Sequence, residues 1–186
     1  MCENHIFIFF FFNQKWFTLS EKLNHSFRYS KFILKIMQGK IVEIKTFSPE
    51  IYRFVCQMLQ QLSPGKHLLS EAAFCAILNS DNAHLFVIKD SQDTPAGMTS
   101  VGIYRTPSGC KAWIEDVVVD ITYRGQGYGK MIVEYAIDFL RHLGADSIAL
   151  TTNASRVAAN HLYPSLGFEK YNTNVYKINV LPLRMP

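Results

Sequence analysis

Three alternate glycines stand between an apolar stretch and a helical pattern. Residues 113–130 read W-I-E-D-V-V-V-D-I-T-Y-R-G-Q-G-Y-G-K. Because Gly125, Gly127 and Gly129 have no side chains, ligand oxygens can approach the main chain and the backbone can take angles that other residues avoid. The helix that follows adds unpaired N–H groups and the positive end of its dipole, both of which favour an anion. This segment predicts a site for a pyrophosphate group.

Spacing of the G-x-G-x-G type occurs in many loops, so the neighbouring residues must identify the site. A dinucleotide-binding fold requires G-x-G-x-x-G early in a βαβ unit, and a nucleoside-triphosphatase loop requires G-x-x-x-x-G-K-[ST]. The chain fits neither pattern, because its glycines are spaced by two and Lys130 is followed by Met131.

With its flanking strand, the glycine segment resembles the Gcn5-related N-acetyltransferase (GNAT) superfamily. The signature of that family, [Q/R]-x-x-G-x-[G/A] directly after a central strand, corresponds to R-G-Q-G-Y-G at residues 124–129. A second family segment, N-H-L-Y-P-S-L-G-F, occupies residues 160–168. It follows after about thirty residues, the length that a crossover helix requires. The resemblance covers roughly residues 37–180 and is closest to bacterial-type members whose acceptor is unassigned.

The resemblance implies an α/β fold of the acyl-CoA N-acyltransferase type. Its mixed sheet has six to seven strands, the fourth and fifth of which part from each other, and about four helices flank it. Hydrophobic patterning and capping residues agree with this fold. They predict strands at 40–47, 84–89, 96–104, from 111, 147–152, 167–170 and 174–180, and helices at 48–62, 70–78, 126–143 and 156–166.

In this family the parted strands hold acetyl-CoA, whose pantetheine amides pair with the fourth strand like an added strand. The resemblance therefore implies one continuous set of cosubstrate-binding residues. Each also has an ordinary structural interpretation: the valines as buried strand, the lysine as a solvated helix residue, and the asparagines as caps or turn residues. The set comprises Val117, Val118, Val119, Arg124, Gly125, Gln126, Gly127, Tyr128, Gly129, Lys130, Asn153 and Asn160.

Acetyl transfer from a thioester to an amine needs a neutral amine, a donor that polarises the carbonyl, and an acid for the departing thiolate. The resemblance assigns the acid to Tyr163, whose hydroxyl is a donor at neutral pH. The alternative is a core tyrosine that anchors its helix.

The candidate bases are Glu115 and Asp116, the only carboxylates on the central strand near the expected reaction site. Successive strand residues face opposite sides, so at most one is expected to point into a given pocket. Desolvation would raise its pKa and suit it to accept the ammonium proton; the alternative is a buried acid paired with a neighbouring strand or with Lys111. The I-E-D-V-V-V run is similar to glucosamine-6-phosphate N-acetyltransferases, but residues 151–160 are similar to bacterial members with unassigned acceptors.

Composition fits one globular domain of 186 residues with 48% apolar content. The formal charge is +4, but residues 1–36 hold five Lys/Arg against two Glu, so the remaining 150 residues carry only +1. A nucleic-acid-binding body is expected to show a more concentrated basic face. The cysteines, at positions 2, 56, 75 and 110, are scattered. They predict reduced, mostly buried thiols of a cytoplasmic protein and no metal site.

Residues 1–36 form an atypical N-terminal extension, and residues 37–186 form the expected GNAT domain. The apolar run at residues 6–12 is too short to span a bilayer, and it lacks the flanking features of a secretory signal. We expect the extension to be dispensable; the alternative is a membrane anchor.

The leading functional hypothesis is an acetyl-CoA-dependent N-acetyltransferase. It would act in a ternary complex on a primary amine of a small molecule or peptide, without metal, nucleic acid or membrane. A non-catalytic acyl-CoA-binding or regulatory module on the same fold is the alternative, because function resides in the site and not in the fold. Homodimers are common in the family, and no amine-recognition motif identifies the acceptor.

Overall fold

The computed structural model describes residues 39–65 and 69–178. The described residues form two compact units, which are divided between Ala149 and Leu150. The predicted extension at 1–36 and the end of the last predicted strand lie outside the described residues. Within the described ranges, no helix combines the length and apolar character needed to cross a membrane.

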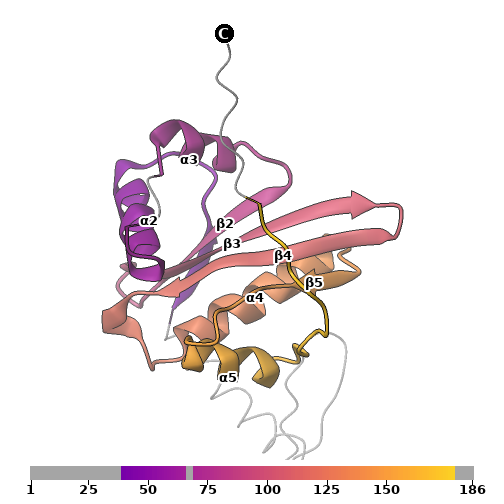
Figure 1. Cartoon of the computed structure of the whole chain (residues 1–186). Helices are drawn as coiled ribbons and strands as arrows, with labels where there is room; N and C mark the ends of the chain where they lie inside the picture. Colours follow the sequence, from indigo (N-terminus) through magenta and orange to yellow (C-terminus); the bar gives the residue numbers. More distant parts are fainter. Residues whose placement is uncertain (1–38, 66–68, 179–186) are drawn as a thin grey trace, which may run out of the picture. The chain divides into compact units, whose positions relative to one another are not determined.

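The first unit is built on a five-stranded mixed sheet in the order β1-β2-β3-β4-β5 (Figure 1). The first three pairings are antiparallel, and the last, between β4 and β5, is parallel. This arrangement confirms the predicted fold class. The strands are β1 (Lys40–Glu43), β2 (Ala83–Lys89), β3 (Pro95–Thr106), β4 (Gly109–Val119) and β5 (Ser147–Ala149).

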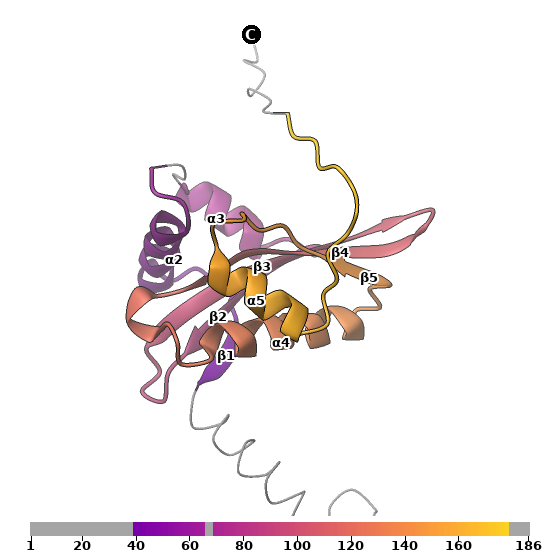
Figure 2. The ribbon, with the colours of Figure 1, turned by 60° about the horizontal axis from the view of Figure 1, so that its bottom comes forward.

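Helices cover both faces of this sheet, with α2 (Pro49–Leu62) and α3 (Glu71–Leu78) on one face and α4 (Tyr128–His142) on the other (Figures 1 and 2). The predicted serine caps are present. The Ser48 Oγ accepts from the N–H of residue 51 at 3.5 Å, and the Ser70 Oγ accepts from the N–H of residue 73 at 3.1 Å. Each cap satisfies a donor that the first helical turn leaves free.

The two faces have separate cores. On the α4 face, the Phe86 ring packs edge-on against Tyr135 and Phe139, with centroid distances of 5.1 and 4.8 Å. Successive residues of a strand face opposite sides of the sheet, so the neighbours of Phe86 along β2 contribute to the second core. That core, under α2 and α3, consists of Val55, Met58, Leu59, Phe74, Leu78, Leu85, Val87, Met98 and Val118.

Several element boundaries differ from the predicted ones. Strand β1 ends at Glu43 instead of residue 47, although the Ile44 N–H still donates to the Leu85 carbonyl at 2.9 Å. Helix α4 begins at Tyr128 instead of residue 126. The reason is that Gly127 has a φ of +88°, a left-handed conformation that cannot continue a helix. Strand β5 ends at residue 149 instead of 152.

The second unit contains α5 (Val157–Ser165) and an extended C-terminal segment. The two strands predicted there do not form in residues 167–178. Polar and apolar alternation indicates which residues would share a face of a strand, but a strand also needs a hydrogen-bonded partner. In this segment large apolar side chains are exposed, among them Tyr171, Val175, Tyr176 and Ile178.

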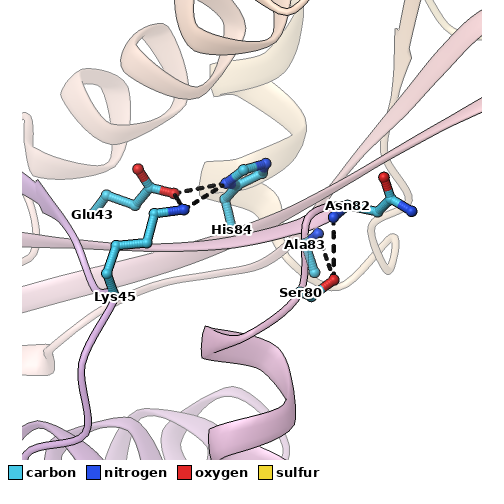
Figure 3. Close-up of polar contacts among 6 residues, drawn as sticks. All are labelled: Glu43, Lys45, Ser80, Asn82, Ala83 and His84. Atoms are coloured by element: carbon cyan, nitrogen blue, oxygen red, sulfur yellow. Dashed lines mark hydrogen bonds and ion pairs between the residues drawn. The ribbon is translucent and has the colours of Figure 1, made fainter.

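A polar cluster ties β1 to β2 on the α4 face (Figure 3). The Glu43 carboxylate pairs with Lys45 and lies 2.7 Å from the Nδ1 of the buried His84. Burial alone would raise the pKa of Glu43, but the hydrogen bonds from Lys45 and His84 outweigh it and hold the pKa below its usual value. At the start of β2, the Ser80 Oγ accepts from the N–H groups of residues 82 and 83.

We expect Glu43→Gln to lower the free energy of unfolding by about 1.5 kcal/mol at neutral pH, the scale of a hydrogen bond to a charged group. A depressed pKa in the folded state stabilises the fold above the unfolded-state pKa and loses that effect as pH falls. The difference between wild type and variant should therefore shrink from pH 6 to pH 3 in urea titrations. A difference that does not change with pH would show that the carboxylate charge is not involved.

Candidate active site

The glycine turn leads from β4 into α4 with a backbone that exposes donors. Gly125 and Gly127 have φ values of +77° and +88°. The first helical bond runs from the Met131 N–H to the Gly127 carbonyl at 3.1 Å. The N–H groups of residues 127–130 therefore have no acceptor within the helix. A Cβ added at Gly125 or Gly127 would meet no atom within 4 Å, so space for an anion lies beside these donors.

Residues distant in sequence hold this turn in place. Its first part is a short 3-10 helix, η1 (Ile121–Tyr123), capped by the Asp120 carboxylate, which accepts from the Thr122 N–H at 2.9 Å. The Gln61 side chain of α2 donates to Asp120 at 2.9 Å and accepts from the N–H of residue 121 at 3.1 Å. The Tyr123 hydroxyl donates to Asp90 at 2.9 Å. Motif spacing did not identify Gln61 or Asp90, because neither lies near the turn in sequence.

The two basic residues of the motif have partners within the first unit. The Arg124 Nε donates to the Val119 carbonyl at 3.1 Å, so this side chain folds back along the end of β4. The Lys130 Nζ lies 4.0 Å from Glu134, one helical turn away. An exposed pair of this kind contributes little to stability, so Lys130 is free to exchange it for a phosphate.

Strand β4 is paired on one edge over most of its length and on the other edge only at its start. Its pairing with β5 covers residues 111–113 opposite residues 147–149, and β4 continues to Val119. The pairing therefore ends at Trp113, and β4 continues without a parallel partner in the first unit, where the predicted parting of the two strands would begin. Val117 and Val119 are half-buried, whereas the Val118 side chain belongs to the core under α2 and α3. The Val118 side chain thus serves as core, and the backbone of the three valines is available to a ligand.

A β-bulge interrupts β4 at the two candidate bases. Ser100 pairs with Glu115 and Met98 with Val118, so the single residue Thr99 lies opposite residues 116 and 117. Asp116 has a φ of +51°, and the Thr99 hydroxyl donates to the Glu115 carbonyl at 2.9 Å. The strict alternation that the sequence predicts for β4 therefore fails at Asp116, because a bulge shifts the phase of the strand.

The two carboxylates have different surroundings. Asp116 accepts from the Ser100 hydroxyl at 3.3 Å. The Glu115 carboxylate has no hydrogen bond or ion pair with any residue that the structure describes, and the predicted alternative of a pair with Lys111 is not found there. Desolvation, followed by the nearby charge of Asp116, raises the pKa of Glu115. Glu115 is therefore the carboxylate better suited to accept a proton.

The second unit holds the remaining predicted residues. Tyr163 is buried, its ring packs edge-on against Phe168 at 5.9 Å, and burial raises its pKa despite the nearby charge of Arg156. The Asn160 amide donates to the carbonyls of residues 153 and 156, at 2.9 Å each. The Asn153 Oδ1 accepts from the Ser155 N–H at 2.9 Å. The donors of Asn160 thus fix the start of α5.

Residues that could bind a metal ion do not cluster near the candidate site residues of either unit in the described part of the chain. Across residues 39–65 and 69–178, no three His, Cys, Asp or Glu side chains are close enough to hold a metal ion together. Cys56, Cys75 and Cys110 are free thiols; Cys110 is buried and the other two are half-buried, while Cys2 lies outside the described residues.

The sequence model of the Acetyltransferase (GNAT) family matches residues 50–168, more than half of the chain. This match covers the bulged strand, the glycine turn and α5. The chain therefore belongs to the GNAT acetyltransferase family.

Individual relatives match over different lengths of the chain. Mycothiol acetyltransferase of Renibacterium salmoninarum is 34% identical over 115 residues, which are 61% of this chain and 32% of that protein. N-alpha-acetyltransferase 30 of Schizosaccharomyces pombe is 26% identical over 147 residues, covering 79% of this chain and 82% of that protein. The chain spans about a third of the length of the first curated relatives it matches.

Solved structures show the same fold. A putative acetyltransferase from Agrobacterium tumefaciens has a TM-score of 0.66 and 24% identity, covering 75% of this chain and 99% of that one. An aminoglycoside acetyltransferase from an uncultured soil metagenomic sample has a TM-score of 0.67 and 17% identity, covering 77% and 96%. At these identities the likeness concerns the fold alone.

Proposed function

We propose that this protein is an acetyl-CoA-dependent N-acetyltransferase that acts on a primary amine of a small molecule or peptide. The observation that carries the proposal is Glu115, an unpartnered carboxylate of raised pKa that lies on the strand leading into the glycine turn. A proton-accepting residue on β4, followed by an anion site in the turn after β4, suits acyl transfer from a thioester that carries phosphate groups.

The donors and open space of the turn fit the pyrophosphate of acetyl-CoA. The N–H groups of residues 127–130 would hold it, with Gly125 and Gly127 leaving room for its oxygens. The backbone of residues 117–119, beyond the last pairing with β5, would bind the pantetheine amides as an added strand does. Asn153 and Asn160 are proposed as further contacts on the family motif they occupy. When bound, acetyl-CoA supplies an acyl thioester, whose acyl carbon forms the new bond to nitrogen as the bond to sulfur breaks.

Two titratable side chains, Glu115 and Tyr163, are proposed to carry out the proton transfers of the reaction. Glu115 accepts the proton of the incoming ammonium, directly or through a water, and leaves a neutral amine that can attack. We assign the protonation of the departing thiolate to the Tyr163 hydroxyl, on the family motif that it occupies. Its raised pKa keeps it protonated at neutral pH, and its proton is replaced from solvent. The net products are an amide, a free thiol and one proton.

Turnover separates this proposal from a non-catalytic acyl-CoA-binding module. Calorimetry would first measure acetyl-CoA affinity, and a thiol reagent would then follow coenzyme release with a panel of small amines and peptides. Release that depends on one class of amine supports the enzyme. Tight binding with no release for any amine supports the module.

We expect Tyr163→Phe to lower kcat by about 10²-fold or more, the usual contribution of a positioned acid, with little change in acetyl-CoA affinity. The ring keeps its edge-on contact with Phe168, so the fold should survive. Steady-state kinetics and calorimetry on the same preparation would check both parts. An unchanged kcat would leave Tyr163 as a core tyrosine only.

A further inference from the structure

One face of the β3–β4 hairpin is covered by helix α4, and toward the tip of the hairpin no described helix of the first unit covers the other face. Directly opposite strand residues share a face. Val101 pairs with Ile114 and with His84, whose ring packs against Phe139 of α4, so both residues are on the α4 face, where they are buried. The end of the hairpin extends beyond β2, whose pairing with β3 stops at Gly102, and α2 and α3 do not reach over that end (Figure 1). The open face, here called the hairpin strip, comprises Ser100, Gly102 and Tyr104 of β3 and Lys111, Trp113 and Glu115 of β4.

The register of the sheet assigns these residues to one side. Leu85, in the core under α2 and α3, pairs with Ser100, and Ser100 pairs with Glu115. Gly102 pairs with Trp113, two residues along each strand. All six residues are half-buried or exposed, and Tyr104 is 46% exposed. Glu115 therefore stands at one end of a surface that continues away from it along the strands.

The chemistry of the strip changes along its length. Two acids, Glu115 and Asp116, lie at the end beside the bulge, and Lys111 lies at the other. Between them is the half-buried Trp113. Beside it, an added Cβ at Gly102 would meet no atom within 4 Å, so an open space adjoins the indole. At a rise of about 3.3 Å per residue, the path from Glu115 to Lys111 is about 13 Å.

We infer that the hairpin strip binds the amino-terminal segment of a peptide in extended conformation. The α-ammonium group lies at the acidic end, and a large apolar side chain from the first two residues occupies the space between Gly102 and Trp113. Lys111 favours an acidic side chain near the third or fourth residue. An open strip of graded charge matches an extended chain better than a compact amine, which would leave the distal half uncovered.

This inference rests on the proposed function and names its acceptor. Two relatives bear names that describe such acceptors, N-alpha-acetyltransferase 30 and the [ribosomal protein bS18]-alanine N-acetyltransferase of Escherichia coli. The identity to the latter is 38% over 60 residues, which are 32% of this chain and 40% of that protein.

The test uses the full chain with lysine-free decapeptides that carry Leu or Ser at position 2 and Glu at position 4. The expected result is acetylation of the α-amine, with KM lower for the Leu peptide by about tenfold, or ~1.4 kcal/mol. Gly102→Val, which fills open space and suits a strand, should raise the KM of the Leu peptide by a similar factor and remove the preference. Its acetyl-CoA affinity and Tm should match those of the wild type.

Tyr104→Ala is a second variant, at the distal part of the strip. This substitution should raise the KM of the decapeptide and leave the KM of a dipeptide amide unchanged. A loss of folding would affect both acceptors. Turnover of spermidine or glucosamine 6-phosphate without turnover of any peptide would overturn the inference and leave the proposed function standing. An unchanged peptide KM in Gly102→Val would also overturn it. Absence of acetyl-CoA binding to the wild type would overturn the proposed function itself.

Discussion

Replacing Glu115 by glutamine is expected to lower kcat/KM by about 10²- to 10⁴-fold, the range attributed to a positioned general base. Glutamine keeps the size of the side chain and cannot accept the proton. Because the Glu115 side chain forms no hydrogen bond with any other described residue, the substitution should not alter stability, and acetyl-CoA affinity should remain. Initial rates measured over pH 5–9, together with calorimetric binding of acetyl-CoA, would check this.

The pH profile gives the same residue a second, independent test. A raised pKa means that the wild-type rate should rise with pH through a midpoint above the ordinary pKa of a glutamate, because only the carboxylate is active. This acidic limb should disappear in Glu115→Gln. An acidic limb that persists would assign it to another group.

Asp116→Asn is the matched control. The charge of Asp116 contributes to the raised pKa of Glu115, so removing it should lower that pKa. The acidic limb should then move to lower pH, while kcat falls far less than in Glu115→Gln. If Asp116→Asn were the more damaging of the two substitutions, the roles of the carboxylates would be reversed.

Replacing Gly127 by valine is expected to weaken acetyl-CoA binding by more than about tenfold, or ~1.4 kcal/mol. The side chain would project into the open space beside the free N–H groups at the start of α4. It would also strain a backbone that has a φ of +88°, at a cost of about 1–2 kcal/mol. Calorimetry with acetyl-CoA and thermal unfolding would measure the two effects separately.

Gly144→Val separates strain from steric block. Gly144 follows the other end of the same helix, has a φ of +80°, and likewise has no atom within 4 Å of an added Cβ. Both variants should therefore lose similar stability, and only Gly127→Val should lose the cosubstrate. Equal losses of affinity in the two variants would refute the assignment of the pyrophosphate to the glycine turn.

The roles proposed for the two units are complementary. The first unit carries the glycine turn, the parted strand β4 and Glu115, which together account for anion binding and proton acceptance. The second carries Tyr163 in α5, to which protonation of the thiolate is assigned. Tyr163→Phe should therefore affect turnover, Gly127→Val affinity, and Gly102→Val the choice of acceptor, three separable measurements.

The local features of the molecule were predicted well because their causes are local. Serine caps form at Ser48 and Ser70 because a side-chain oxygen reaches an N–H three residues on, whatever the rest of the chain does. The glycine turn was predictable because positive φ at Gly125 and Gly127 suits residues without a Cβ. The parallel pairing of β4 and β5 follows from the length of the crossover that contains α4.

Features that depend on strand partners were predicted less well. The bulge at Asp116 becomes visible only when β4 is aligned with β3. Because of it, Glu115 and Asp116 do not follow the simple rule that successive strand residues face opposite sides of the sheet. The exposed segment around Tyr171 and Tyr176 has strand-like composition but forms no strand in residues 167–178.

The sequence by itself determined the fold class, the anion-binding turn and the short set of residues that carry the candidate chemistry. Only the tertiary structure decided which carboxylate stands without a partner, that Gln61 and Asp90 hold the turn, and that Trp113 and Gly102 share the face of Glu115. The physical reason is range. Backbone preference and capping act within a few residues, whereas register, burial and desolvation arise when segments 15 to 60 residues apart come into contact.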